Sequence, residues 1–184
     1  MSSQALNRLT TIHGEHLKDV IEIINDAPTE PKTLLMQRLL VVGLVAFWEV
    51  FHEELCRESL AFHPNPPETA EQRIKGFHNP EPKKITCLYN NVLGIHDITE
   101  SWWGNFPQKT GKTPDEFRAT IQRMIKLRHD TAHGIWGLPL SPKDCQDFLV
   151  AVLLLAVRTD KAVHAHFQTS KEKRKKRDGG AESA

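Results

Sequence analysis

Apolar residues recur at helical spacing along most of the chain. Over Gln4–Asp26 they fall three or four positions apart, which predicts an amphipathic helix capped by Ser2 or Ser3. A second helix is predicted to open at Pro31 and to continue to about Phe62. Its middle, LLVVGLVAFWEVF, is apolar almost all round, and this is typical of the central helix of a bundle.

The next part of the chain is less regular. Five prolines over His63–Pro82 predict a long connection with one short helix near Glu71–Phe77. Helical spacing then resumes over Lys83–Trp103, although Gly94 weakens that prediction at its centre. No stretch alternates with period two for long enough to predict a strand.

Two further helices carry explicit start signals. Thr113 stands at an N-cap position, a proline follows it, and Glu116 completes a capping box. Gly134 is suited to the left-handed conformation that ends a helix. Ser141–Asp144 repeats the same start signal, and the last helix is predicted to end near Phe167. The pattern therefore predicts an all-α, single-domain bundle of four to five helices over residues 1–168.

Composition agrees with a globular domain. The chain has 184 residues, 39% of them hydrophobic and 26% charged, which suits one domain with its own core. Cys56, Cys87 and Cys145 form no CxxC pair, so we expect a reducing, cytoplasmic setting rather than a disulfide framework. The N-terminus has no signal-peptide pattern, and the apolar run Leu39–Val50 is shorter than the ~20 residues of a membrane span, so no membrane is expected.

Charge is unevenly placed. The net charge is +1, but residues 171–184 carry an excess of basic residues and leave the rest of the chain slightly acidic. We expect residues 169–184 to be a disordered basic tail. A second interpretation is attraction to RNA phosphates. Its candidate contacts are Lys171, Arg174, Lys175, Lys176 and Arg177.

The candidate chemistry lies at the end of the helix that opens at Thr113. There the chain places Arg128, His129, Asp130 and His133 directly before a glycine. Histidine titrates near neutral pH and can donate or accept a proton. A guanidinium stabilises charge on phosphate oxygens without losing its own proton. This set of side chains is therefore suited to cleavage of a phosphodiester.

The stretch RHDTAHG resembles the ribonuclease motif of the HEPN superfamily, an arginine followed after four residues by a histidine at a helix end. The context is similar too, because an apolar helix with an internal acid, Glu49 in AFWEVF, precedes the motif. The resemblance covers roughly residues 1–168. It implies an all-helical domain that cleaves single-stranded RNA without a metal or other cofactor and leaves a 2′,3′-cyclic phosphate.

The resemblance also implies roles for individual residues. His133 is the expected general acid or base, and Arg128 the expected clamp on the transition state. His129 is a candidate second proton-transfer group, although many members of the superfamily have Asn there. Asp130 or Glu49 is the expected orienting acid. Lys126 and Trp136 are weaker candidates for RNA contact.

The spacing of the motif predicts a second copy of the chain. Five residues turn a helix by about 500°, so Arg128 and His133 project about 140° apart. Two motif helices packed about a two-fold axis would supply both kinds of side chain to one cleft. We therefore expect a homodimer, as in HEPN enzymes, with RNA as substrate. A neutralising or regulatory protein is a further expected partner, in a defence, toxin–antitoxin or RNA-processing setting.

Two alternatives remain open at this point. In one, Arg128 and His133 only bind the last carbonyls of their helix, and the protein is a non-catalytic module that dimerises and binds another protein. In the other, His96-Asp97 and His129-Asp130 belong to an HD-type metal phosphohydrolase. That alternative needs further ligands, for which His13, His63, Asp147 and Asp160 are available. A nucleotide-binding phosphate loop is excluded, because Phe106 stands where GKT would need a glycine.

Overall fold

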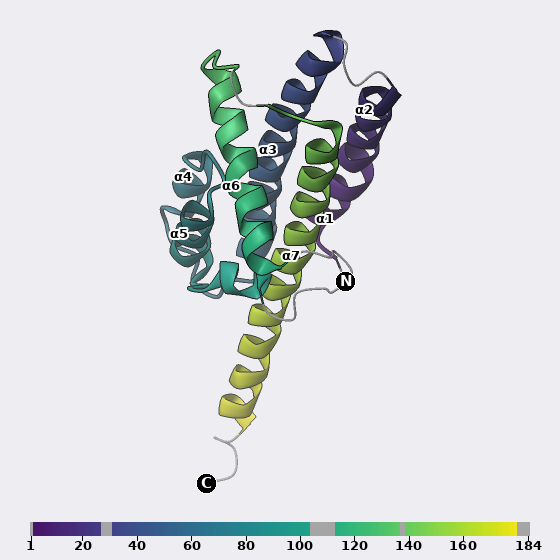
Figure 1. Ribbon diagram of the computed structural model, residues 1–184. Helices are drawn as coiled ribbons and strands as arrows, with labels where there is room; N and C mark the ends of the chain where they lie inside the picture. The colour runs from purple at the N-terminus through teal and green to yellow at the C-terminus, as the bar shows by residue number, and fades with distance from the viewer. Residues whose placement is uncertain (1, 27–30, 104–112, 137–138, 180–184) are drawn as a thin grey trace.

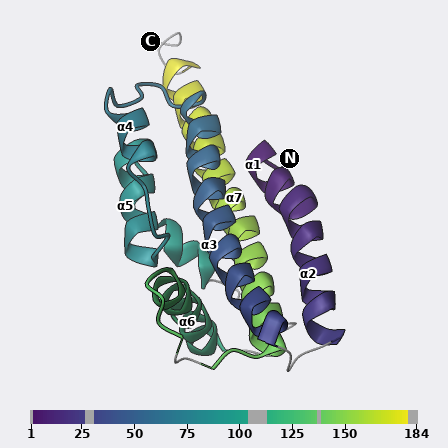
Figure 2. The same ribbon diagram turned by 90° about the horizontal axis from the view of Figure 1, so that it is seen from above.

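The all-α prediction is confirmed. The computed structural model describes residues 2–26, 31–103, 113–136 and 139–179, with side chains up to residue 169, and these residues form helices and no strand. The two longest helices, α3 (Pro31–Leu60) and α7 (Pro142–Gly179), lie side by side along the middle of the molecule (Figures 1 and 2).

The other helices cover α3 and α7 from both sides. On one side α1 (Gln4–Asn7), a π-helical turn (Arg8–His13) and α2 (Gly14–Asp26) follow one another, so the predicted helix over residues 4–26 is present with a π turn inside it. Ser3 is its N-cap, because the Ser3 side chain accepts a hydrogen bond from the Leu6 N–H.

The opposite side is made by α6 (Pro114–Ala132) and by the short α4 (Ala70–Lys75) with α5 (Pro82–Leu93), as Figure 2 shows. The predicted helix over Lys83–Trp103 is wrong in its second half. Gly94 takes a left-handed conformation with φ +70° and ends α5, and a 3-10 helix follows at Ile98–Trp102.

The core lies where α3 meets α6 and α7. Its largest fully buried side chains are Trp48, Trp102, Tyr89, Phe51, Phe117 and Phe148. Cys56 and Cys145 are buried, Cys87 is exposed, and all three are free thiols. Burial raises the pKa of Cys145 to about 12 and also raises that of Cys56, so the two buried thiols are unreactive.

The last helix departs from the prediction at its end. α7 continues to Gly179 instead of ending near Phe167, so the backbone is helical over most of the segment expected to be disordered. Lys, Glu and Arg are good helix formers, and adding residues to an existing helix is easier than starting one. Figure 1 shows this end of α7 projecting beyond the other helices.

One helix in the described part of the chain is long and apolar enough to cross a membrane. It is α3, whose most apolar 18-residue window has a mean hydropathy of 1.8, and 44% of that window is buried inside the fold. The core helix of a bundle meets the same criterion, and α3 packs against α6 and α7. The short apolar run seen in the sequence therefore understated how far the apolar character of this helix extends.

Candidate functional site

The polar cluster around Arg128–His133 lies at the end of α6, where the helix reaches solvent. Both predicted signals of this helix are confirmed. The Thr113 hydroxyl accepts from the Glu116 N–H at 3.3 Å, and the Glu116 carboxylate accepts from the Thr113 N–H at 2.7 Å. At the other end His133 is the C-cap and Gly134 has φ +71°. Caps at both ends fix where the cluster lies.

The two histidines of the cluster are in contact with each other. The rings of His129 and His133 have their centroids 4.4 Å apart, and both side chains are exposed. They lie one turn apart on the same face of α6. No ring nitrogen of either histidine takes part in a hydrogen bond or ion pair within the part of the chain that the structure describes. Two imidazoles are therefore available to solvent at one place.

Arg128 is half-buried on a different face of the helix. α6 is regular up to Ala132, so Arg128 and His133 project about 140° apart, as their spacing predicts. Among the described residues the Arg128 guanidinium forms no hydrogen bond or ion pair. One chain thus brings the two histidines together and leaves Arg128 apart from both.

Asp130 has a partner other than the histidines. Its side chain is 6% exposed, and its carboxylate accepts a hydrogen bond from the Lys126 ammonium at 3.0 Å. Its backbone carbonyl accepts from the Ile135 N–H at 2.8 Å, which fixes the turn after α6. Asp130 and Lys126 are therefore paired with each other, and along the helix Asp130 lies about one turn and Lys126 about two turns from His133.

Glu49 forms no hydrogen bond or ion pair with Arg128 or His133, and its partners are in the loop before α5. One carboxylate oxygen accepts from the Asn79 backbone N–H at 2.8 Å, and the other lies 3.5 Å from the His78 ring nitrogen. No contact of Glu49 therefore supports its expected role as the acid that orients a side chain of the motif. Glu49 instead fixes the loop before α5, because it faces that loop from α3.

The structure adds Arg38, a residue that the sequence analysis missed. Arg38 is only 7% exposed, and its guanidinium donates to the Trp136 carbonyl at 2.7 Å and to the Thr131 hydroxyl at 3.4 Å. It also lies 5.0 Å from the centre of the Trp136 ring. Arg38 therefore attaches the segment after α6 to α3. A lone arginine in the apolar stretch LLMQRLLVV was the available signal.

Trp136 itself is 53% exposed. Its backbone and one ring face are held by Arg38, so the remaining ring surface is displayed to solvent beside the end of α6. This placement is compatible with the predicted RNA contact and equally with a contact to another protein chain.

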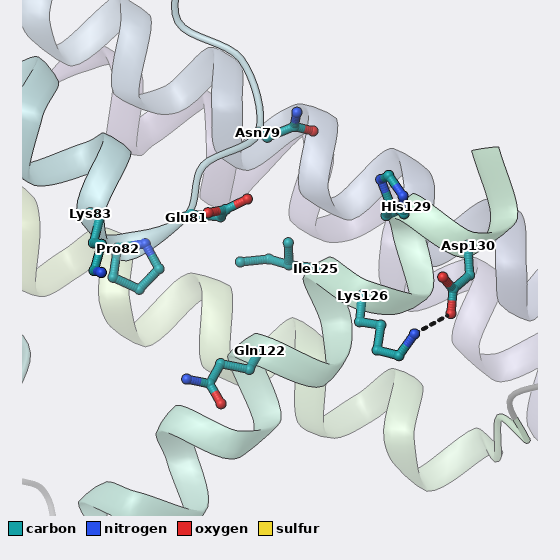
Figure 3. A pocket seen from close by; sticks show the side chains of 9 residues that line it. All are labelled: Asn79, Glu81, Pro82, Lys83, Gln122, Ile125, Lys126, His129 and Asp130. Carbon is teal, nitrogen blue, oxygen red and sulfur yellow. Dashed lines mark hydrogen bonds and ion pairs between the residues drawn. The ribbon is translucent and has the colours of Figure 1, made fainter. Parts of the chain in front are cut away.

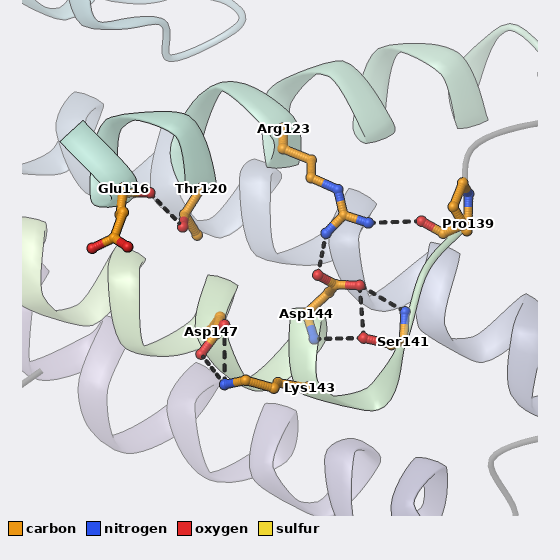
Figure 4. Close-up of polar contacts among 8 residues, drawn as sticks. All are labelled: Glu116, Thr120, Arg123, Pro139, Ser141, Lys143, Asp144 and Asp147. Atoms are coloured by element: carbon orange, nitrogen blue, oxygen red, sulfur yellow. Dashed lines mark hydrogen bonds and ion pairs between the residues drawn. The ribbon is translucent and has the colours of Figure 1, made fainter. Parts of the chain in front are cut away.

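A second polar junction holds α6 against the start of α7 (Figure 4). Arg123 donates to the Asp144 carboxylate and to the Pro139 carbonyl, the latter at 2.8 Å. Asp144 also accepts from the Ser141 N–H and hydroxyl, so the predicted capping box of α7 is confirmed. Burial acts to raise the pKa of Asp144, but the hydrogen bonds from Arg123 and Ser141 and the charge of Arg123 lower it overall.

A cavity of about 580 Å³ opens beside the motif, between the start of α5 and α6 (Figure 3). His129, Asp130 and Lys126 line one end of it, and Pro82 and Lys83 line the other. Three of the predicted site residues therefore share one cavity, and Arg128 and His133 are not among its lining residues.

The described residues offer no set of metal ligands for the HD-type phosphohydrolase alternative. Within the described ranges no three His, Cys, Asp or Glu side chains are grouped so that they could hold a metal ion. His129-Asp130 lies on α6, whereas His96-Asp97 lies in the connection after α5.

The basic residues of the tail lie on the projecting end of α7, and their side chains fall outside the described residues. In Figure 1 α6 ends near the start of α7, and the last turns of α7 lie at the opposite end of the molecule. The helix thus carries Lys171 and Arg174–Arg177 away from the motif of the same chain.

Comparison with known protein families, with characterised proteins and with solved structures gave no match for this chain.

Proposed function

We propose that the protein is a metal-independent endoribonuclease of the HEPN type that cleaves single-stranded RNA as a homodimer. The observation that carries the proposal is the state of the side chains at the end of α6. The Arg128, His129 and His133 side chains have no hydrogen-bond partner in the described part of the chain, and the two histidines are exposed. Polar groups held at a helix end without a structural role are available for a substrate.

The same observation weighs against a purely structural role. A C-cap role would need the Arg128 or His133 side chain to donate to the last carbonyls of α6. The carbonyls of His129, Asp130 and Thr131 instead accept hydrogen bonds from backbone N–H groups of the residues that follow, His133, Gly134 and Ile135. The side chains are therefore not required to end the helix.

The chemistry follows from the residue types. One imidazole takes the proton of the ribose 2′-OH, and the 2′-oxygen attacks the adjacent phosphorus. The bond from phosphorus to the 5′-oxygen breaks, and an imidazolium protonates that oxygen. The products are a 2′,3′-cyclic phosphate and a 5′-hydroxyl. Arg128 stabilises the extra negative charge on the phosphate oxygens by paired hydrogen bonds.

A second copy of the chain completes this site. His129 and His133 belong to one face of α6 and Arg128 to another, so a partner's motif helix would bring an arginine to the histidines of the first. Exposed apolar side chains on α3 support the pairing of two copies. Leu35, Leu39 and Val50 are each more than 40% exposed and follow one face of α3. Arg38, which holds Trp136, belongs to the same part of α3.

The test is cleavage of a labelled single-stranded RNA with and without EDTA. Arg128→Ala and His133→Ala should each lower the rate by roughly 100- to 10,000-fold, the range for loss of an acid–base group or an oxyanion donor. Arg118→Ala, on the same helix, and His16→Ala, on α2, are matched controls that should cleave normally. EDTA should have no effect.

Mixing the two inactive variants tests the composite site. A heterodimer of Arg128→Ala and His133→Ala subunits retains one arginine and one histidine on different chains, so cleavage should partly return. Cleavage abolished by EDTA supports the metal phosphohydrolase instead. If neither the native protein nor any control cleaves RNA, the non-catalytic binding module remains, with the apolar face of α3 as its binding surface.

A further inference from the structure

The cavity between α5 and α6 contains polar groups that the proposed reaction does not use. Glu81 is the N-cap residue of α5, yet its side chain makes no capping hydrogen bond. It forms no ion pair with other described residues either. In Figure 3 Glu81 lies at the start of α5, across the cavity from Ile125 of α6. A carboxylate left unpaired at the wall of a cavity is a ready hydrogen-bond acceptor for a ligand.

The wall that carries Glu81 is held in place. The Asn79 N–H donates to Glu49 at 2.8 Å, and the Glu81 N–H donates to the Asn79 carbonyl at 2.7 Å. Asn79 adopts a left-handed conformation with φ +57°, which an asparagine tolerates better than most residues. Pro82 then fixes the first turn of α5. The backbone that carries the Glu81 acceptor is thus fixed before any ligand arrives, so only the side chain has to be ordered on binding.

The opposite wall is formed by α6 and ends at the motif. Ile125 presents an aliphatic surface between the two ends of the cavity, and His129 lies at the end nearest to His133 (Figure 3). The volume of about 580 Å³ is within the range of small-molecule sites, and one nucleotide fits it. Lys126 and Lys83 lie at opposite ends, where phosphates flanking a bound base would run.

We propose that this cavity is a nucleobase subsite that seats a guanine of the RNA next to the cleaved bond, with Glu81 as the residue that selects it. Single-stranded RNA is read by splayed bases that pack on side chains and pair through their edges. A carboxylate offers two acceptors side by side, and guanine is the base whose Watson–Crick edge presents two neighbouring donors, N1–H and the N2 amino group. Uracil presents one donor between two carbonyl oxygens, which a carboxylate repels.

This inference rests on the proposed function, and two experiments keep the two apart. In the first, a random-sequence RNA is cleaved by the native protein and the cut sites are sequenced. Guanine should be enriched about tenfold or more over uracil at one position beside the cut, as expected for a good two-point contact to a base. Glu81→Gln and Glu81→Ala should remove the enrichment while total cleavage continues. Glu22→Gln, an exposed acid on α2, should keep it.

The second experiment needs no cleavage. Guanosine 3′-monophosphate and uridine 3′-monophosphate are titrated into the Arg128→Ala protein and followed by NMR. The guanosine nucleotide should bind about tenfold more tightly or better, and Glu81→Ala should remove that difference. Cleavage without guanine enrichment, together with equal binding of the two nucleotides, overturns the subsite and leaves the nuclease. Selective guanosine binding without any cleavage overturns the nuclease and supports the subsite.

Discussion

At the scale of single residues, His52 on α3 has an environment unlike that of the other histidines. Its side chain is fully buried, its Nδ1 lies 3.0 Å from the Tyr89 hydroxyl, and its Nε2 has no partner among the described residues. Trp48 and Phe51 pack against the ring. Burial lowers the pKa of His52 to about 3, so the ring is neutral in the folded protein.

The neutral His52 makes the fold sensitive to acid. Below pH 6.5 the unfolded chain binds a proton at this ring and the folded chain does not. The free energy of unfolding therefore decreases as the pH is lowered from about 6.5 to about 3. Above pH 6.5 the full stability is present. The expected contribution is about 1.4 kcal/mol for each pH unit below 6.5. Urea unfolding at neutral and mildly acidic pH measures it.

The variant His52→Phe isolates this contribution. It keeps an aromatic ring in the core and removes the titrating group, so the pH dependence of its stability should be flatter than that of the native protein. The variant loses the bond to Tyr89 and is expected to be less stable at neutral pH. Equal slopes in the two proteins would show that His52 does not control acid stability.

Substitution of Arg38 is expected to alter the end of α6, although Arg38 itself does not contact the substrate. Arg38→Lys keeps the charge but cannot reach Thr131 and the Trp136 carbonyl with one planar group. Loss of such charged hydrogen bonds costs about 1.5–3 kcal/mol of stability. If Arg38 positions the motif, kcat for RNA should fall while KM stays unchanged. Arg8→Lys, at an exposed ion pair with Glu54, is the matched control.

At the scale of elements, the outer face of α3 has apolar side chains that no helix of the described part of the chain covers. Leu35, Leu39, Val42, Ala46 and Val50 recur at helical spacing on this face, and all are at least partly exposed. A soluble helix with such a face is expected to bury it against another surface. The proposed second copy of the chain would supply that surface beside the motif.

Charge placed on this face should separate the two copies. In Leu35→Glu/Leu39→Glu, two carboxylates would have to be buried at each half of the interface, so the protein should become monomeric and lose cleavage. Sedimentation equilibrium measures the oligomeric state. Ile23→Glu, at an exposed apolar position on α2, should leave the protein dimeric. A doubly substituted protein that stays dimeric would place the interface elsewhere.

Local signals in the sequence predicted the ends of the elements that carry the site. The capping box at Thr113, the capping box at Ser141 and the glycine after α6 each depend on residues within four positions of one another. Their geometry follows from backbone hydrogen bonds that any helix end must satisfy. Both ends of α6 and the start of α7 could therefore be predicted without a structure.

Contacts between distant segments could not be predicted in this way. Arg38 meets Trp136 across 98 positions, and Glu49 meets Asn79 across 30. The same polar residue in an apolar helix can face solvent, a loop or a site, and only packing decides among them. Glu49 was therefore expected at the motif, whereas the fold uses it to hold one wall of the neighbouring cavity.

At the scale of the whole molecule, charge and motif lie at opposite ends. Without residues 171–184 the chain would be slightly acidic, so the basic residues of the tail dominate any attraction to a polyanion. A helix rises 1.5 Å per residue, so Lys171 lies about 45 Å along α7 from its start near the end of α6. A basic tail at that distance acts on long RNA and not on a short one bound at the motif.

RNA length should therefore decide whether the tail matters. Replacing Lys171, Arg174, Lys175, Lys176 and Arg177 with Gln should weaken binding of a long single-stranded RNA and leave cleavage of a short oligonucleotide unchanged. Each lost phosphate contact lowers the slope of log K against log salt by about 0.7 on a single strand, so the slope should fall by up to about 3.5. Fluorescence anisotropy over a salt series measures it. Equal slopes before and after substitution would mean that the tail does not contact RNA. An equal loss of binding for short and long RNA would indicate that the tail of one chain lies near the motif of its partner.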